Sequence, residues 1–217
     1  MSEKKVRPYT VAEEVLSSSI HGLGAVLGVA ALCILVVLSA IYANAWAVVS
    51  SAIFGTSIIF LYTSSTLYHA IPGERIKKRL KKLDHIAIYY LIAGSYTPFL
   101  LVNLRGTVGW TLFGIVWGLA ALGTILKIAV GGAGTKLWSI GLYTVMGWLV
   151  IFASKRIYEV LPTVSFVFLV LGGLFYTFGI LFYVWKSKKY THSIWHLFVL
   201  GGTIMHFFAI LFGCVLL

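Results

Sequence analysis

Seven apolar stretches, each close to the length needed to cross a bilayer, constrain this 217-residue chain more than any other feature. A helix needs roughly 20 apolar residues to span a membrane. Hydrophobic residues make up 60% of the sequence and charged residues 11%, which is more apolar material than a soluble core requires. The stretches also lack the ~10-residue alternating pattern of an outer-membrane barrel. We therefore predict an all-α membrane protein with seven transmembrane helices, over residues 20–41, 46–68, 84–104, 108–126, 137–153, 162–185 and 192–217.

The polar start of the chain, residues 1–19, differs from the rest. It is charged and has no short apolar core before a cleavage site, so the first span is expected to be an uncleaved anchor. Thr10 and Glu13 have capping-box spacing, which predicts a short interfacial helix before the membrane. Residues 20–217 show no internal repeat and no long linker. We therefore expect a cytoplasmic segment, 1–19, followed by a single transmembrane domain, 20–217.

The distribution of basic residues predicts the orientation. If the N-terminus is cytoplasmic, only Arg105, Lys155 and Arg156 of the 17 Lys and Arg residues lie outside. The positive-inside rule then places the N-terminus inside and the C-terminus outside. The net charge of +11 is thus explained by short loops, and nucleic acid is not an expected partner. Six basic residues in the 75–82 loop predict an amphipathic helix lying on anionic headgroups. Within the third span, Pro98 predicts a kink.

Five of the six histidines fall at one predicted depth, the cytoplasmic edge of the bundle. His192 and His196 are four residues apart and share one face of the last span. His69 follows the second span at the same depth. Three neutral imidazoles and a water form a typical catalytic zinc site. We therefore expect His69, His192 and His196 to bind Zn²⁺, with helix contacts or pH sensing as alternative roles for the His192–His196 pair.

Asp84 and Ser65 are the candidate catalytic side chains beside this metal site. No glutamate lies between His192 and His196, so the His-Glu-x-x-His scheme of soluble proteases is absent. A separate carboxylate must then move protons, and Asp84 is the candidate base at the start of the third span. Ser65, one turn before His69, can orient the water or bind a developing oxyanion. Capping of the third span is the alternative role of Asp84.

The other three histidines have less specific roles. On a helix, His85 points about 100° away from Asp84, so we interpret it as a residue that supports the metal ligands or packs between helices. For His21, support of the ligands and helix packing are both open. His206 lies about 15 Å beyond His196 at ~1.5 Å per residue, and we interpret it as an interhelical contact.

These motifs, in this order, resemble the bacterial hemolysin III family over nearly the whole chain, from about Glu13 to His206. The likeness rests on Glu13-Glu14, Ser18-Ser-Ile-His21-Gly, Ser65-x-x-x-His69, Asp84-His85, Gly94-Ser-Tyr-Thr-Pro-Phe99 and His192-x-x-x-His196. That family belongs with the progestin and adipoQ receptors and, more widely, with the alkaline ceramidases. The resemblance implies zinc near the cytoplasmic side held by the same three histidines, with Ser65 and Asp84 beside it, in a bacterial inner membrane. Ser17 and Ile20 depart from the Asn and Thr that are usual in bacterial relatives.

Three functions of different classes are compatible with these residues. The first is zinc-dependent hydrolysis of an amide- or ester-linked acyl lipid within the membrane, serving lipid homeostasis, as the ceramidase likeness implies. The second is a non-enzymatic sensor or receptor with a structural zinc, which a fourth ligand from His85 or His21 would favour. The third is the pore-forming cytolysin that the family name suggests. Membrane lipids, including a substrate with an acyl chain, are the expected partners.

Overall fold

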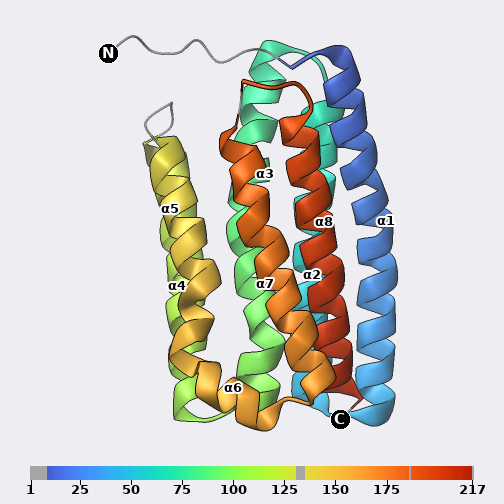
Figure 1. Cartoon of the computed structure of the whole chain (residues 1–217), viewed down its shortest axis with the longest axis vertical. Coiled ribbons are helices and arrows are strands. Elements are labelled where there is room, and N and C mark those ends of the chain that lie inside the picture. The colour runs from blue at the N-terminus through green and yellow to red at the C-terminus, as the bar shows by residue number, and fades with distance from the viewer. Residues whose placement is uncertain (1–8, 131–134, 186, 217) are drawn as a thin grey trace.

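The computed structural model describes residues 9–130, 135–185 and 187–216. Over these residues the chain is helical without strands, and seven of its helical segments are long and apolar enough to cross a membrane. They stand side by side in an elongated bundle (Figure 1). The predicted all-α membrane fold is therefore confirmed. Residues 1–8 of the predicted polar segment, the Gly-rich link 131–134 and Lys186 lie outside the described residues.

The helices follow one another along the chain with short connections. Their bounds are α1 Val11–Tyr42, α2 Ala45–Ala70, α3 Glu74–Pro98, α4 Thr107–Ala129, α5 Thr135–Trp148, α6 Ser154–Val160, α7 Thr163–Val184 and α8 Thr191–Ile210. The π-helices η1 (Phe99–Asn103) and η3 (Leu211–Val215) extend α3 and α8, and a 3₁₀ turn, η2 (Leu149–Ala153), links α5 to α6. In Figure 1, α4 and α5 stand on one side of the bundle and α1 on the other. We call the end where α1 and α8 begin the upper end, as in that view.

Helix α1 begins with the predicted capping box. The hydroxyl of Thr10 accepts a hydrogen bond from the Glu13 amide at 3.3 Å, and the Glu13 carboxylate accepts one from the Thr10 amide at 2.9 Å. These contacts satisfy amides that have no partner inside the helix. The helix is continuous from Val11 to Tyr42, so the predicted short helix is not a separate element before the first span. Residues 11–19 form the first turns of the same helix as residues 20–42.

Helix α3 also begins earlier than predicted. Pro72 and Gly73 separate it from α2, and Gly73 has a φ of +104°, which glycine adopts without steric strain. From Glu74 the helix is continuous to Pro98. The basic residues 75–82 therefore extend the spanning helix, and the predicted separate helix lying on the membrane surface is wrong.

The hydrogen-bonding pattern of helix α3 changes directly after Pro98, where the sequence predicted a kink. Pro98 has no amide hydrogen to donate, and directly after it the chain changes to π-helical hydrogen bonding in η1. The Leu104 amide donates a hydrogen bond to the Phe99 carbonyl five residues earlier, at 2.9 Å.

Residues 154–156, predicted as a loop, lie in helix α6 at the lower end of the bundle (Figure 1).

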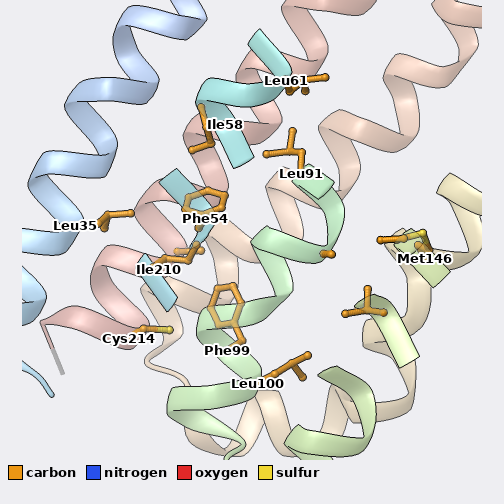
Figure 2. Packing of buried hydrophobic residues seen from close by; sticks show 14 of the residues in the cluster. Leu35, Phe54, Ile58, Leu61, Leu91, Phe99, Leu100, Met146, Ile210 and Cys214 are labelled. Atoms are coloured by element: carbon orange, nitrogen blue, oxygen red, sulfur yellow. The ribbon is translucent and has the colours of Figure 1, made fainter. Parts of the chain in front are cut away.

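The buried core lies between α1, α2, α3 and α8 and reaches α5 (Figure 2). Leu35, Phe54 and Ile210, from three different helices, are fully buried there. Lipid tails are as apolar as these side chains, so the hydrophobic effect does not hold the helices together inside a membrane. Their association depends instead on close van der Waals packing between helices. A Cβ at Gly24 would lie 2.7 Å from Cε1 of Tyr62, so α1 approaches α2 closely at this glycine.

Candidate metal centre

The structure brings His69, His192 and His196 together at the upper end of the bundle. His69 lies in the last turn of α2, and the other two lie in the first two turns of α8. One potential ligand atom of each side chain lies within 4.8 Å of those of the other two. The Nε2 atoms of His69 and His196 are 3.0 Å apart. The three rings thus form a compact cluster of nitrogen donors, which we call the histidine triad.

The triad has the dimensions of a metal site. Zinc–nitrogen bonds of about 2.0–2.1 Å in a tetrahedron place donor atoms roughly 3.3 Å apart. The observed nitrogen separation is close to that spacing for His69 and His196, and the other two separations need to shorten by about 1.5 Å at most. His196 Nδ1 is buried and has no hydrogen-bond partner among the described residues. These donors therefore fit a divalent metal ion.

Glu14 fixes the orientation of His69. Its Oε2 atom lies 2.5 Å from His69 Nδ1, and its Oε1 atom lies 2.9 Å from Lys77 Nζ. A proton on Nδ1 that is donated to the carboxylate leaves the lone pair of Nε2 free to face His196. Carboxylate–histidine pairs of this kind orient metal ligands and raise their basicity. Glu14 therefore supports the triad from the start of α1.

The neighbouring Glu13 ties α1 to the start of α8. Its Oε1 atom accepts a hydrogen bond from the Tyr190 amide at 2.8 Å. Tyr190 has a φ of +63°, an uncommon value for a residue with a side chain, and Thr191 begins α8 directly after it. Ser17 and Ser193 add a hydrogen bond of 2.9 Å between the same two helices. Contacts from α1 thus hold both helices that carry the triad.

Tyr9 covers the triad from above. Its half-buried ring stacks on His192, with centroids 4.8 Å apart and planes at 18° to one another. The same ring lies 6.3 Å from His69. The residue directly before α1 therefore packs against two of the three rings of the triad.

Asp84 and Ser65 lie beside the triad, as the sequence suggested. Asp84 is buried and lines a small pocket of about 30 Å³ together with His192 and His196. Ser65 is fully buried one turn before His69, with its hydroxyl next to the Asp84 carboxyl. The alternative role of Asp84 as a helix cap is wrong, because α3 begins ten residues earlier, at Glu74. A buried carboxyl thus shares the small pocket with two candidate ligands.

His85 and His21 are not part of the triad. Nε2 of His85 faces the Tyr183 hydroxyl at 3.4 Å, and its carbonyl accepts a hydrogen bond from Tyr143 at 2.7 Å. The ring of His21 packs edge-on against His196, with centroids 3.8 Å apart. In the described part of the chain, the histidine triad is the group whose donor atoms could hold a metal ion. One or more positions around a metal there would be left for water or substrate.

A larger, mostly apolar cavity of about 330 Å³ adjoins the small pocket. It is walled mainly by α3, α5, α7 and α8, together with η2. Five residues line both spaces: Leu61, Ile88, Tyr183, Trp195 and Val199. The triad therefore lies at the end of an apolar space in the middle of the bundle.

Comparison with known proteins agrees with this architecture. The family described as haemolysin-III related matches residues 9–207. The chain belongs to the haemolysin-III-related family. It is 47% identical to the hemolysin-3 homolog of Bacillus subtilis (strain 168) over 95% of this chain and 97% of that protein. It is 45% identical to hemolysin-3 of Bacillus cereus over 98% and 97% of the two chains.

A more distant similarity extends to animal proteins. The human monocyte to macrophage differentiation factor is 28% identical over 77% of this chain and 71% of its own length. The seven spans and the two Bacillus relatives support a multi-pass membrane protein of bacterial type.

Two residues beside the triad of this haemolysin-III-related protein were not predicted to be there. The sequence alone indicates no role at the site for Glu14 or Tyr9, because both precede the first predicted span. A signal was nevertheless present. Glu14, Ser17 and His21 recur every three or four residues at the start of an apolar helix, and such a polar stripe faces the interior of a bundle.

Proposed function

We propose that this protein is a zinc-dependent hydrolase that cleaves an amide or ester bond of an acyl lipid within the membrane. The observation that carries the proposal is the shared wall between the triad's small pocket and the apolar cavity. An acyl chain in the cavity would bring its carbonyl carbon to the triad and Asp84. A ligand site of a few hundred Å³ with few polar groups is typical for a small apolar molecule.

The residues suit a hydrolytic reaction. His69, His192 and His196 would hold the zinc ion, which would supply Lewis acidity that polarises the carbonyl and acidifies the attacking water. The Asp84 carboxylate accepts a proton from that water as its oxygen bonds to the carbonyl carbon. The proton then passes to the departing nitrogen or oxygen as the C–N or C–O bond breaks, which yields a fatty acid and an amine or alcohol. Ser65, whose hydroxyl lies next to Asp84, would orient this carboxyl by donating a hydrogen bond during the reaction.

The zinc assignment is tested by metal content. Purified wild-type protein in detergent is expected to contain about one zinc per chain by mass spectrometry, the stoichiometry of a single mononuclear site. His69→Ala and His196→Ala are expected to lose it, because each removes a donor from the triad. His85→Ala is the matched control and should retain the metal, since its ring faces Tyr183. Zinc that persists in both triad variants would contradict the assignment.

The hydrolase assignment needs turnover. Fluorescent N-acyl sphingoid and acyl ester lipids in mixed micelles are suitable substrates, with release of the fatty acid as the readout. Activity that follows zinc content and is absent from His196→Ala would support the proposal. Full zinc content with no turnover of either lipid class would favour the second candidate function, a membrane sensor or receptor with a structural metal. The contacts of Glu14 and Tyr9, which hold and cover the ligands, are what favours that candidate.

The upper end is proposed to face the cytoplasm of a bacterial inner membrane. That end carries the basic residues of the segment 75–82 together with Lys127, Lys188 and Lys189. Positive loops are retained on the cytoplasmic side and attract anionic headgroups there. Labelling of Lys188→Cys by an impermeant maleimide, in a Cys33→Ala and Cys214→Ala background, should occur only after the cells are opened. Labelling of intact spheroplasts would reverse the orientation.

Relatives named hemolysin-3 make cytolysis a function to test directly. Purified protein and its His196→Ala variant can be added to red cells, with haemoglobin release as the readout. Lysis equal in both variants and independent of zinc would show that the triad is not needed for it.

A further inference from the structure

The polar groups that line the central cavity are almost all hydrogen-bonded within the protein. The hydroxyls with assigned partners are Tyr96 with Gly147, Tyr143 with His85, Thr144 with Ile140, Tyr176 with Thr203 and Thr177 with Gly173. Each of these bonds runs to a backbone carbonyl or to a neighbouring side chain. A ligand in the cavity would therefore find few polar atoms to bind.

His206 is a buried exception on the cavity wall. It is buried, and neither ring nitrogen has a hydrogen-bond partner among the described residues. The backbone carbonyl of Leu169 approaches the ring without reaching hydrogen-bonding geometry, and it could serve only one of the two nitrogens. Tyr176 meets the ring edge-on at 5.3 Å. A buried polar group without a partner destabilises the folded protein, so its persistence needs a reason.

The surroundings of His206 make room for its ring. Helices α7 and α8 approach closely at Gly172, where an added Cβ would lie 2.6 Å from His206 Nε2. Any larger residue at this position would displace the imidazole. The ring therefore occupies a space that the neighbouring helix leaves for it, at the edge of the cavity.

The distance between His206 and the triad suggests what the ring could bind. His206 lies ten residues after His196 on α8, which is about 15 Å along the helix. An extended chain advances roughly 1.2 Å per bond, so about a dozen bonds separate the two places. We propose that His206 is a subsite that hydrogen-bonds an oxygen atom in the middle of an acyl chain, about a dozen bonds from the carbonyl held at the triad.

This subsite rests on the acyl-chain cavity of the proposed function but requires neither turnover nor a particular metal. It can therefore be tested by binding alone. A fluorescent fatty acid bound to the detergent-purified full-length protein is displaced by three competitors: stearic acid, stearic acid with a hydroxyl on the twelfth carbon, and the isomer with the hydroxyl on the third carbon. The wild type is expected to bind the twelfth-carbon isomer about 3- to 10-fold more tightly than stearic acid, the size of one net hydrogen bond.

The variants show whether His206 causes the preference. His206→Leu should abolish the preference for the twelfth-carbon hydroxyl while binding stearic acid at least as well as the wild type. His206→Gln keeps a hydrogen-bonding group in the same space and should retain part of the preference. Thr177→Val is the matched control, because its hydroxyl is already bonded to Gly173 and its loss should leave the preference unchanged. Metal content and melting temperature show that each variant is folded.

The possible failures can be told apart. Equal binding of all three acids by a folded wild type would overturn the subsite, and so would a preference that survives unchanged in His206→Leu and His206→Gln. Failure of every fatty acid to bind would overturn the subsite together with the acyl-chain cavity. A preference that depends on His206 in a protein without hydrolytic activity would keep the subsite and refute only the hydrolase.

Discussion

Around the histidine triad, side chains from α1, α2, α3 and α8 touch one another closely, whereas around the cavity the walls from α3, α5 and α7 leave an apolar space of about 330 Å³. At the triad, the Glu14 carboxylate contacts His69 at the end of α2. The Glu13 carboxylate accepts a hydrogen bond from the Tyr190 amide at the start of α8. On the cavity side, the smallest share of residues buried inside the protein is found in three spans: α4, α7 and Trp138–Val160, which includes most of α5.

The difference follows from what each region has to do. Metal donors must stay within a few tenths of an ångström of their places, so the triad needs support from several directions. An apolar chain needs space and has few directional contacts to satisfy. We therefore expect substitutions at the triad to act on metal binding and chemistry, and substitutions at the cavity to act on ligand choice.

Replacement of Asp84 by Asn should give the most pronounced change in activity. It removes the proton acceptor but keeps the shape of the side chain, and general acid–base catalysis contributes about 10²–10⁴-fold. Fatty-acid release should fall by that factor, while zinc content stays at the wild-type level because Asp84 is not in the triad. Ser65→Ala serves as the milder companion. Equal turnover in Asp84→Asn and wild type would exclude the proposed base.

Loss of the carboxylate beside His69 should weaken metal binding without abolishing it. Glu14→Gln removes the charge that orients the ring, and supporting carboxylates of this kind are worth about 10- to 100-fold in metal affinity. A competition titration with a zinc chelator measures the change. Glu74→Gln is the control, since Glu74 is exposed and pairs only with Lys78 among the described residues. An affinity unchanged in Glu14→Gln would mean that the triad needs no support from α1.

Two adjacent glycines of α7 test the contrast between packed and open regions. A Cβ at Gly172 would collide with His206, whereas a Cβ at Gly173, which lines the cavity, would meet nothing within 4 Å. Gly172→Ala should cost about 1–3 kcal/mol of stability by overpacking. Gly173→Ala should change stability by less than about 0.5 kcal/mol. Thermal unfolding in detergent compares the two variants, and similar melting temperatures would show that α7 and α8 are free to separate.

These glycines also show where prediction from the sequence ends. Gly172 and Gly173 are indistinguishable in the sequence, because the difference between them depends on how α7 is rotated against α8. The cavity was unpredictable for the same reason. The seven spans were predictable, because a bilayer imposes their length and apolar character whatever their packing.

The site was partly predictable. His69, His192 and His196 were selected together because alternating spans place them at one depth, and the structure brings them within 4.8 Å. The roles of Glu14 and Asp84 depended on where α1 and α3 begin. Both helices start about ten residues earlier than hydrophobicity suggests, since charged residues can continue a helix beyond the membrane without breaking it. Helix starts are set by caps and breakers such as Thr10 and Gly73 rather than by the first apolar residue.

Two neighbouring lysines of α3 provide the smallest expected effect. Lys77 is half-buried and lies 2.9 Å from the Glu14 carboxylate, whereas Lys78 is exposed and pairs with Glu74 at 2.8 Å. Ion pairs that remain open to solvent contribute up to about 1 kcal/mol, or roughly fivefold in an equilibrium. Lys77→Gln should therefore weaken zinc binding by about two- to fivefold through Glu14 and His69. Lys78→Gln should leave zinc binding unchanged, although it alters the net charge equally. A similar loss in both variants would show that the charge of the upper end, rather than the contact with Glu14, acts on the triad. A loss confined to Lys77→Gln, which shrinks at high salt, would extend the support of the triad from α1 to the basic turns of α3.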